Sequence, residues 1–352
     1  MRNLFMPFSP YHLLLIYALA AEDKSGAENI LVPSNGNARM AGALDVFTKL
    51  FPDVKFNIVK MKSADSRHVI PRALANRKNL KTIKKYIAGA DDIAKFYYSC
   101  EWNIYTVYVS NALMKGKNPP ECHFIEDGIA TYAGERIKPK HFIEWTSEAL
   151  FYGSWYKGCA VPGHLNSGAI IEALRPDLLP EVYANDKKHR VNLSSLKSKF
   201  RMDNLPDKVL DFIAEGGIDT LIALDSSYSH TNDEYFGIVR DIIMAATARG
   251  YRVAIKRHPH DIKNSTLIKY LNVSTDLIEL PSYLPVEMFY YIFNKTLKMV
   301  IGGMGTSVFT AKQLLPHVEA ISIAESPRAD DAYTRYIIKL FESAGISVKF
   351  LG

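Results

Sequence analysis

The sequence has few cysteines and no apolar run long enough to cross a membrane. Its three cysteines, Cys100, Cys122 and Cys159, are widely spaced, with no C-x-x-C pair and no histidine at metal-ligand spacing. This argues against a disulfide framework or a zinc site and favours thiols in a reducing compartment. Pro7 and Pro10 interrupt the first apolar segment, which we read as a strand, a turn and a helix rather than a signal peptide. We therefore expect a cytoplasmic protein, with any membrane contact peripheral, at the inner membrane.

The sequence also lacks a large excess of either charge. The 352 residues carry 43 Lys and Arg against 37 Asp and Glu, a net charge of +6, and 48% are hydrophobic. This composition is typical of a globular chain with room for two domains. The basic excess favours anionic ligands, an acidic polymer or an anionic membrane face, although solubility alone would explain it equally well. The most basic stretch, residues 72–85, is short and has no aromatic residue, so we expect no nucleic-acid partner.

Short apolar runs alternate with helical patterns, which predicts parallel α/β sheets. One series of strands runs from Leu4–Met6 to His123–Ile125, and a second runs from Thr220–Leu224 to Ala320–Ile323. Open sheets of this kind bind ligands where their strands end. The fold class we predict from this alternation is α/β, with two Rossmann-like, doubly wound domains facing a central cleft.

The domain boundary is predicted where this periodicity weakens, between Lys157 and Asn204. We assign residues 1–185 to an N-terminal acceptor-side domain and residues 186–330 to a C-terminal nucleotide-donor domain. Residues 331–352 are predicted to form a helix that packs back on the N-terminal domain.

An acidic pair with a glycine, Glu126-Asp127-Gly128, follows the strand at His123–Ile125. Gly128 gives the backbone the freedom to present the pair at the sheet edge. Because neighbouring side chains on extended backbone point in opposite directions, one carboxylate should face the cleft while the other caps or orients. The residue facing the cleft could act as a general base, and the sequence does not say which of the two it is. An ordinary polar turn would also explain the motif.

A basic turn closes the strand predicted at Arg252–Ile255 in the second half of the chain. Lys256 would add a positive charge there, and His258, as a residue that titrates near neutrality, could donate a proton or a hydrogen bond to a phosphate. Pro259 would fix the turn. A solvated basic loop is the alternative.

A glycine-rich turn stands between a strand at Met299–Ile301 and a predicted helix that begins at Ser307. Gly303 and the hydroxyls of Thr306 and Ser307 suit a phosphate seat at a helix N-terminus. The turn has neither the lysine of a P-loop nor the G-x-G-x-x-G spacing of a dinucleotide site. A tight turn with hydroxyl caps would explain it as well.

Five further candidates stand near predicted strand ends. Ser9, His12 and Asn35 should flank the cleft on the acceptor or donor-sugar side, together with Gly128. Ser282 and Glu287 should lie on the nucleotide side, where the Glu287 carboxylate could accept ribose hydroxyls. Helix capping would explain Ser9, Asn35 and Glu287 almost as well.

Two aspartate pairs, Asp91-Asp92 and Asp330-Asp331, raise the question of a divalent metal. Both pairs open predicted elements amid polar residues, so we interpret them as surface caps. We expect no metal and no cofactor.

Taken in order, Glu126-Asp127-Gly128, Lys256-Arg257-His258-Pro259 and Thr306-Ser307 resemble the motifs of the bacterial sialyltransferases of GT-B architecture, as does the opening Ser9-Pro10-Tyr11-His12. The capsule polysialyltransferases and the lipooligosaccharide sialyltransferases are the most similar groups. Thr306 departs from their usual pair of serines.

The resemblance implies an inverting, metal-independent transfer of sialic acid, or a related nonulosonate, from a CMP-sugar to a hydroxyl of a bacterial surface glycan. In the family's terms the acidic pair supplies the base, His258 supports the departing CMP phosphate, Thr306 and Ser307 contact it, and Glu287 binds the ribose. The partners would be CMP-sialic acid and a glycan acceptor. Three alternatives stay open: another donor such as CMP-Kdo, CMP-legionaminate or a UDP-sugar, a sugar-nucleotide epimerase, and a non-catalytic glycan-binding protein.

Overall fold

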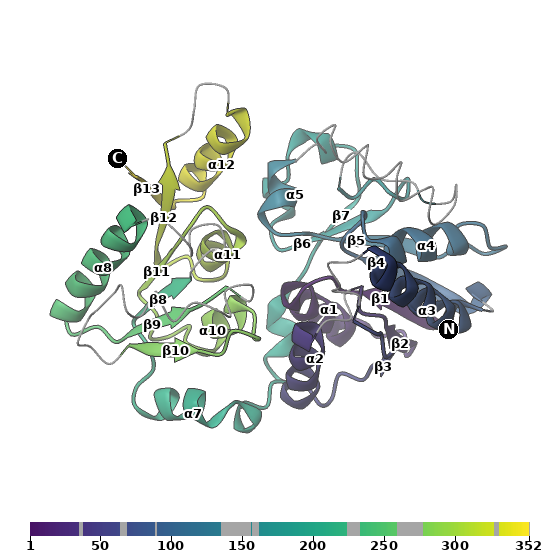
Figure 1. Ribbon diagram of the computed structural model, residues 1–352, viewed down its shortest axis with the longest axis horizontal. Coiled ribbons are helices and arrows are strands. Elements are labelled where there is room, and N and C mark those ends of the chain that lie inside the picture. Colours follow the sequence, from purple (N-terminus) through teal and green to yellow (C-terminus); the bar gives the residue numbers. More distant parts are fainter. Residues whose placement is uncertain are drawn as a thin grey trace. The chain divides into compact units, whose positions relative to one another are not determined.

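The chain forms two compact units, Met1–Arg201 and Met202–Gly352, each built on its own parallel sheet (Figure 1). The computed structural model describes residues 1–34, 38–63, 69–88, 90–134, 156, 162–223, 233–258, 277–326 and 331–351. In this part of the chain no helix is both long and apolar enough to cross a membrane. Cys100 and Cys122 are buried free thiols, and Cys159 lies outside the described residues.

The first unit carries a seven-stranded sheet in the order β3-β2-β1-β4-β5-β6-β7. Its strands are β1 (Arg2–Met6), β2 (Glu28–Leu31), β3 (Asn57–Ile58), β4 (Ile93–Tyr98), β5 (Glu121–Ile125), β6 (Ile170–Ala173) and β7 (Lys188–Arg190). The order reverses between β1 and β4, where Leu4 pairs with Ile30 on one side and with Phe96 on the other. Loops that follow these strands therefore gather at a topological switch point, the usual ligand edge of a Rossmann-like sheet.

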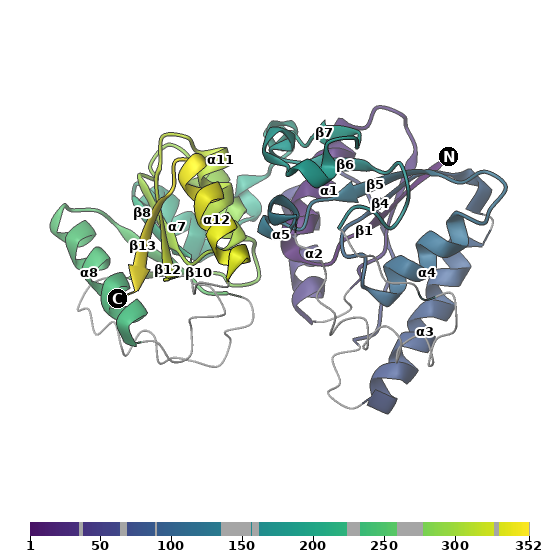
Figure 2. The ribbon, with the colours of Figure 1, turned by 90° about the horizontal axis from the view of Figure 1, so that it is seen from above.

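The helices described in this unit bury apolar side chains. They are α1 (Pro10–Glu22), α2 (Ala38–Leu50), α3 (Val69–Ile87), α4 (Ile104–Leu113) and the short α5 (Ile129–Ala133). The buried apolar side chains of α3 and α4 belong to the same cluster as those of the strands. In α1 every residue from His12 to Ala20 is buried, as expected for a helix that is apolar on all sides. Helices α3 and α4 lie side by side (Figure 2).

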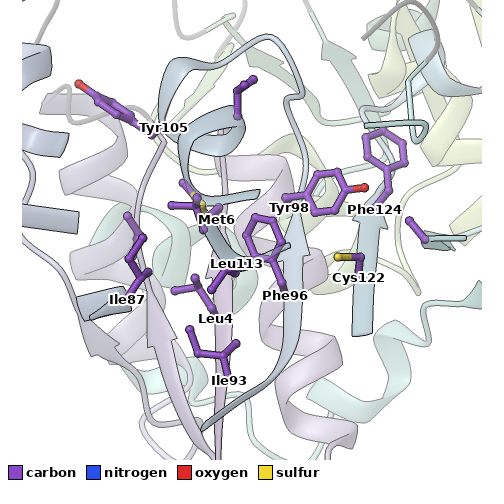
Figure 3. Close-up of a cluster of buried hydrophobic side chains, with 14 of the residues drawn as sticks. Leu4, Met6, Ile87, Ile93, Phe96, Tyr98, Tyr105, Leu113, Cys122 and Phe124 are labelled. Atoms are coloured by element: carbon purple, nitrogen blue, oxygen red, sulfur yellow. The ribbon is translucent and has the colours of Figure 1, made fainter. Parts of the chain in front are cut away.

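A cluster of buried side chains joins the strands of the first sheet. Leu4 and Met6 of β1, Phe96 and Tyr98 of β4 and Phe124 of β5 belong to it (Figure 3). Each fully buried side chain of this size contributes roughly 1.5–3 kcal/mol relative to an exposed one. This packing fixes the carboxyl ends of β1 and β5, from which the acidic pair and the first turn of α1 extend.

The second unit carries a six-stranded parallel sheet in the order β10-β9-β8-β11-β12-β13. Its strands are β8 (Thr220–Ala223), β9 (Val253–Lys256), β10 (Ile278–Leu280), β11 (Met299–Gly302), β12 (Glu319–Glu325) and β13 (Ser347–Leu351), and its α-helices are α7 (Asp207–Ala214), α8 (Asp233–Ala248), α10 (Val286–Ile292), α11 (Thr306–Leu314) and α12 (Ala332–Ser343). The strand order again reverses, between β8 and β11, so two doubly wound domains are present as predicted.

The division between the units differs from the predicted one at residues 185 and 186. The short strand β7 pairs with β6 and so extends the first sheet to Arg190, and the first unit continues to Arg201. At the other end of the chain, β13 pairs with β12, and residues 331–352 belong to the second unit. The predicted helix is present as α12, which leads into β13, the edge strand of the second sheet, and the packing of this helix on the first domain stays a prediction.

Candidate active site

The turn after β1 is fixed by a reciprocal cap. Ser9 begins α1 with an extended backbone, and its side chain accepts a hydrogen bond from the His12 backbone N–H at 3.5 Å. In return the Ser9 backbone N–H donates to His12 Nδ1 at 3.1 Å. Pro10, at the first helical position, has no N–H to leave unpaired. The cap orients the His12 ring, which is fully buried.

Glu126 follows β5 and is completely buried. Its carboxylate accepts hydrogen bonds from the hydroxyls of Tyr11 and Tyr132 and from the backbone N–H of Leu174 at 3.2 Å. Burial, together with the negative charge of Glu126, raises the pKa of Tyr132 well above its ordinary value. Tyr132 therefore stays protonated and acts as a permanent donor to this carboxylate.

Asp127 has different surroundings from its neighbour. Its side chain is 35% exposed, and its Oδ1 lies 3.2 Å from His12 Nε2. That contact has the distance of an ion pair but lacks the direction of a hydrogen bond. The Asp127 backbone N–H donates to Thr131 Oγ1 at 2.8 Å. Of the two carboxylates, Asp127 is therefore the one that a solvent-borne hydroxyl can reach without rearrangement.

Gly128 makes this arrangement possible. Its backbone has φ 59° and ψ −139°, a conformation that is open to glycine and strained for other residues. The chain can therefore leave β5, expose Asp127 and start α5 within three residues.

In the second unit, Lys256 is the last residue of β9 rather than part of the turn, and it is only 4% exposed. Its Nζ donates to the carbonyl of Arg257 at 2.8 Å and to the carbonyl of Ser282 at 3.1 Å. Burial lowers the pKa of Lys256 to about 8, against the opposing effect of the Glu287 charge. The ammonium group thus joins the loops that follow β9 and β10. A direct role in phosphate binding, as the sequence suggested, would require it to leave these carbonyls.

Glu287, in the first turn of α10, is 3% exposed. Burial raises its pKa, and the hydrogen bonds of its own backbone and of Thr310 oppose the rise, as does the charge of Lys256. Thr310 Oγ1 donates to Glu287 Oε1 at 3.0 Å. In this conformation the carboxylate is enclosed, so the ribose-binding role expected from the sequence would require it to become accessible.

The glycine-rich turn ends β11 and starts α11. The helix begins at Thr306, and its N-cap, Gly305, has no side chain that could cap it. Ser322 Oγ donates to the carbonyl of Gly303 at 3.2 Å, and the Tyr290 hydroxyl donates to the carbonyl of Ser307 at 2.9 Å. An anion could take the place of the missing cap, because the first turn of a helix presents backbone N–H groups and positive potential.

The structure thus gathers the predicted residues into two groups, one in each unit. The first group contains Ser9, His12, Glu126, Asp127 and Gly128, at the ends of β1 and β5. The second group, at the ends of β9, β10 and β11, contains Lys256, His258, Ser282, Glu287, Gly303, Thr306 and Ser307. Asn35 and Pro259 lie outside the described residues.

Three contributors were not singled out from the sequence. Tyr11 and Tyr132 hold Glu126, and Thr310 holds Glu287. Tyr11 stands inside the motif Ser9-Pro10-Tyr11-His12, so its position was a usable signal. Tyr132 and Thr310 gave none, because the pairing depends on how α5 and α11 pack.

One aspartate of each pair has a hydrogen-bond donor within the protein. Asp92 accepts from Arg2 Nε at 2.7 Å, and Asp331 caps α12 by accepting from the Thr334 backbone N–H at 2.9 Å. Asp330 lies outside the described residues. Within the described ranges no group of three or more His, Cys, Asp or Glu side chains could hold a metal ion.

Comparison with known proteins gives one family and a set of similar folds. The family model described as alpha-2,8-polysialyltransferase (POLYST) matches residues 3–324. No curated protein matches the chain.

Among solved structures, an alpha/beta-galactoside alpha-2,3-sialyltransferase from the luminous marine bacterium Photobacterium phosphoreum has a TM-score of 0.62 at 13% identity, with 99% of this chain and 98% of that chain covered. The UDP-GlcNAc 2-epimerase of Neisseria meningitidis has a TM-score of 0.58 at 12% identity, covering 100% of this chain and 88% of that one. The UDP-GlcNAc 2-epimerase of Methanocaldococcus jannaschii has a TM-score of 0.57 at 13% identity, covering 100% of this chain and 89% of that one. At these identities the similarity concerns the fold, which is the predicted GT-B class.

Proposed function

The chain belongs to the alpha-2,8-polysialyltransferase family and is a sialyl-transferring glycosyltransferase, and we propose that its donor is CMP-sialic acid and that its transfer is inverting and metal-independent. The observation that supports an inverting transfer most directly is the accessible carboxylate of Asp127, which can serve as the base. It lies at the ligand edge of the first sheet, beside the buried Glu126. The acceptor is a hydroxyl of a bacterial surface glycan, such as a capsule or a lipooligosaccharide.

In the proposed reaction the acceptor hydroxyl attacks the anomeric carbon of the donor sugar. Its oxygen forms the new glycosidic bond while its proton passes to the carboxylate of Asp127. The bond between the anomeric carbon and the phosphate oxygen breaks, and its electron pair stays on the departing CMP. Because the acceptor attacks opposite the leaving group, the configuration at the anomeric carbon is inverted.

The second unit supplies the groups that stabilise the departing CMP. His258 follows β9 and can donate to the phosphate. The first turn of α11, whose N-cap residue is Gly305, presents backbone N–H groups at Thr306 and Ser307. Lys256, charged at neutral pH, holds the loop that carries His258 through its bond to the Arg257 carbonyl. Such donors can stabilise the negative charge that grows on the departing phosphate, which supports the proposal of a transfer without a divalent ion.

The proposal is tested by incubating the purified protein with CMP-sialic acid and with galactosyl- and sialyl-terminated acceptors in EDTA. We expect release of CMP and an acceptor heavier by one or more sialic acid residues, with the opposite anomeric configuration to the donor. If EDTA abolished transfer and added Mg²⁺ restored it, the proposed metal independence would be contradicted. Turnover of UDP-sugars but not of CMP-sialic acid would overturn the choice of donor.

His258→Ala separates the role of the leaving-group donor from that of the base. Both CMP binding, measured by calorimetry, and turnover should fall together, because the phosphate contact exists in the bound donor as well as in the transition state. A variant with normal CMP affinity and normal turnover would remove His258 from the proposed site.

A further inference from the structure

His12 occupies a position between the helix cap and the acidic pair. Its ring is fully buried, with Nδ1 against the Ser9 backbone and Nε2 at 3.2 Å from Asp127 Oδ1. Nε2 is a buried polar atom that makes no directed hydrogen bond in this conformation. Such an atom costs free energy until it finds a partner, and the partly exposed carboxylate of Asp127 needs only a small rotation to become one.

The cap determines which ring nitrogen carries the hydrogen. A backbone N–H can only donate, so His12 Nδ1, which receives the bond from Ser9 at 3.1 Å, must present its lone pair. Ser9 Oγ also lies 2.9 Å from Nδ1 and can direct its own hydrogen there. The hydrogen of the neutral ring is therefore on Nε2, which faces Asp127.

We propose that His12 is a positioning residue for Asp127, donating a hydrogen bond from Nε2–H to the carboxylate and holding it toward the acceptor. It does not relay the proton. A second ring proton would have to enter at Nδ1, where it would break the cap from Ser9. The consequence for turnover rests on the proposed function, while the tautomer and the contact do not.

The residue type fits this double task. The position of His12 in the cap is usually taken by Glu or Gln, whose side chain reaches back to the N-cap backbone. A histidine performs the same capping with one nitrogen and has a second nitrogen on the far side of a rigid ring. Glutamine can replace histidine in the cap, but its flexible side chain offers no equally rigid hydrogen-bond donor toward Asp127.

The direct test is nitrogen NMR of the protein labelled with ¹⁵N-histidine, in which the resonances of His12 are assigned by their loss in His12→Gln. We expect an unprotonated Nδ1 and a protonated Nε2. In Asp127→Ala the Nε2 resonance should shift while Nδ1 stays unprotonated. A protonated Nδ1 in the wild type, or an Nε2 resonance that Asp127→Ala leaves unmoved, would overturn the proposal whether or not the protein is an active transferase.

Kinetics of two variants supply the second test. His12→Gln keeps the cap, so it should melt close to the wild type, bind CMP normally and lose about tenfold or more in kcat. His12→Leu removes both interactions and should lose thermal stability as well. Wild-type kcat in His12→Gln would reduce His12 to a helix cap and overturn its positioning role. Absence of transfer in the wild type would instead count against the proposed function, and the NMR result would still decide the inference.

Discussion

Tyr132 donates its hydroxyl hydrogen to Glu126 Oε2 and accepts a hydrogen bond from the Arg175 backbone N–H at 3.0 Å. The side chain thereby ties the end of β5 to α5 and to the segment after β6. The Asp127-Gly128 turn lies between the two bonded residues. The exposure of Asp127 therefore depends on a neighbouring carboxylate that is held inside the protein.

We predict that Tyr132→Phe lowers the free energy of unfolding by about 1.5–3 kcal/mol, because it removes a hydrogen bond to a buried charged group. Tyr105→Phe is the matched control: the Tyr105 hydroxyl also accepts one bond and donates one, but its partners are the neutral amides of Asn79 and Asn76. That control should cost about 0.5–1.5 kcal/mol. Urea denaturation of both variants checks the prediction, and equal losses would count against a charged Glu126.

The buried ammonium of Lys256 predicts a pH dependence. Its pKa in the folded protein is about 8, below the ordinary value of 10.5. Between these values the unfolded chain retains a proton that the folded protein has lost, so stability rises with pH through this window. Relative to Lys256→Met, which does not titrate, the wild type should gain roughly 3 kcal/mol from pH 8 to pH 10.5.

Denaturation of the wild type and Lys256→Met across this range measures the gain. The buried tyrosines also titrate at alkaline pH, but they are common to both proteins and cancel in the difference. A difference that stays constant between pH 8 and pH 10.5 would show that Lys256 keeps its ordinary affinity for the proton.

The turn that precedes α11 has no room for a side chain at Gly302. A Cβ there would lie 2.6 Å from the Ala223 carbonyl oxygen and 2.8 Å from Val308 Cγ2. Gly302→Ala should therefore cost about 1–3 kcal/mol of stability and disturb CMP binding. In Gly237→Ala, by contrast, the Cβ meets no atom within 4 Å inside α8, and the change should stabilise by about 0.5–1 kcal/mol. Melting curves that rank the two variants in the opposite order would be incompatible with this packing.

The sequence was a good guide to the sheets and to the edges where the motifs stand. Buried parallel strands such as β8 and β11 are continuous apolar runs, and the alternation with helices determines that they pair in parallel. The edge strands were harder to predict from the sequence. All three residues of β7 are exposed, and β13 is mostly exposed, so neither has an apolar pattern that marks a strand. The sequence therefore did not reveal that β7 continues the first sheet or that β13 forms the edge of the second.

The sequence indicated candidate residues for the site but not the environment of each side chain. Glu126 and Asp127 differ in burial because two tyrosines from different helices enclose one of them, and no local pattern records that packing. Lys256 and Glu287 looked like ligand-binding side chains because charged residues are rarely buried. Their enclosure follows from Ser282 and Thr310, which approach only when the sheet is folded.

The central claim is that the accessible carboxylate of the acidic pair takes the proton of the acceptor. The most direct measurement compares the rate of sialic acid transfer and the affinity for CMP in Asp127→Asn and Glu126→Gln. We predict that Asp127→Asn melts like the wild type, binds CMP normally and loses about 10²–10⁴-fold in kcat. Glu126→Gln should instead lower the melting temperature, because its main effect is on stability. Wild-type turnover in Asp127→Asn, with turnover abolished in a fully stable Glu126→Gln, would contradict the account and assign the base to Glu126.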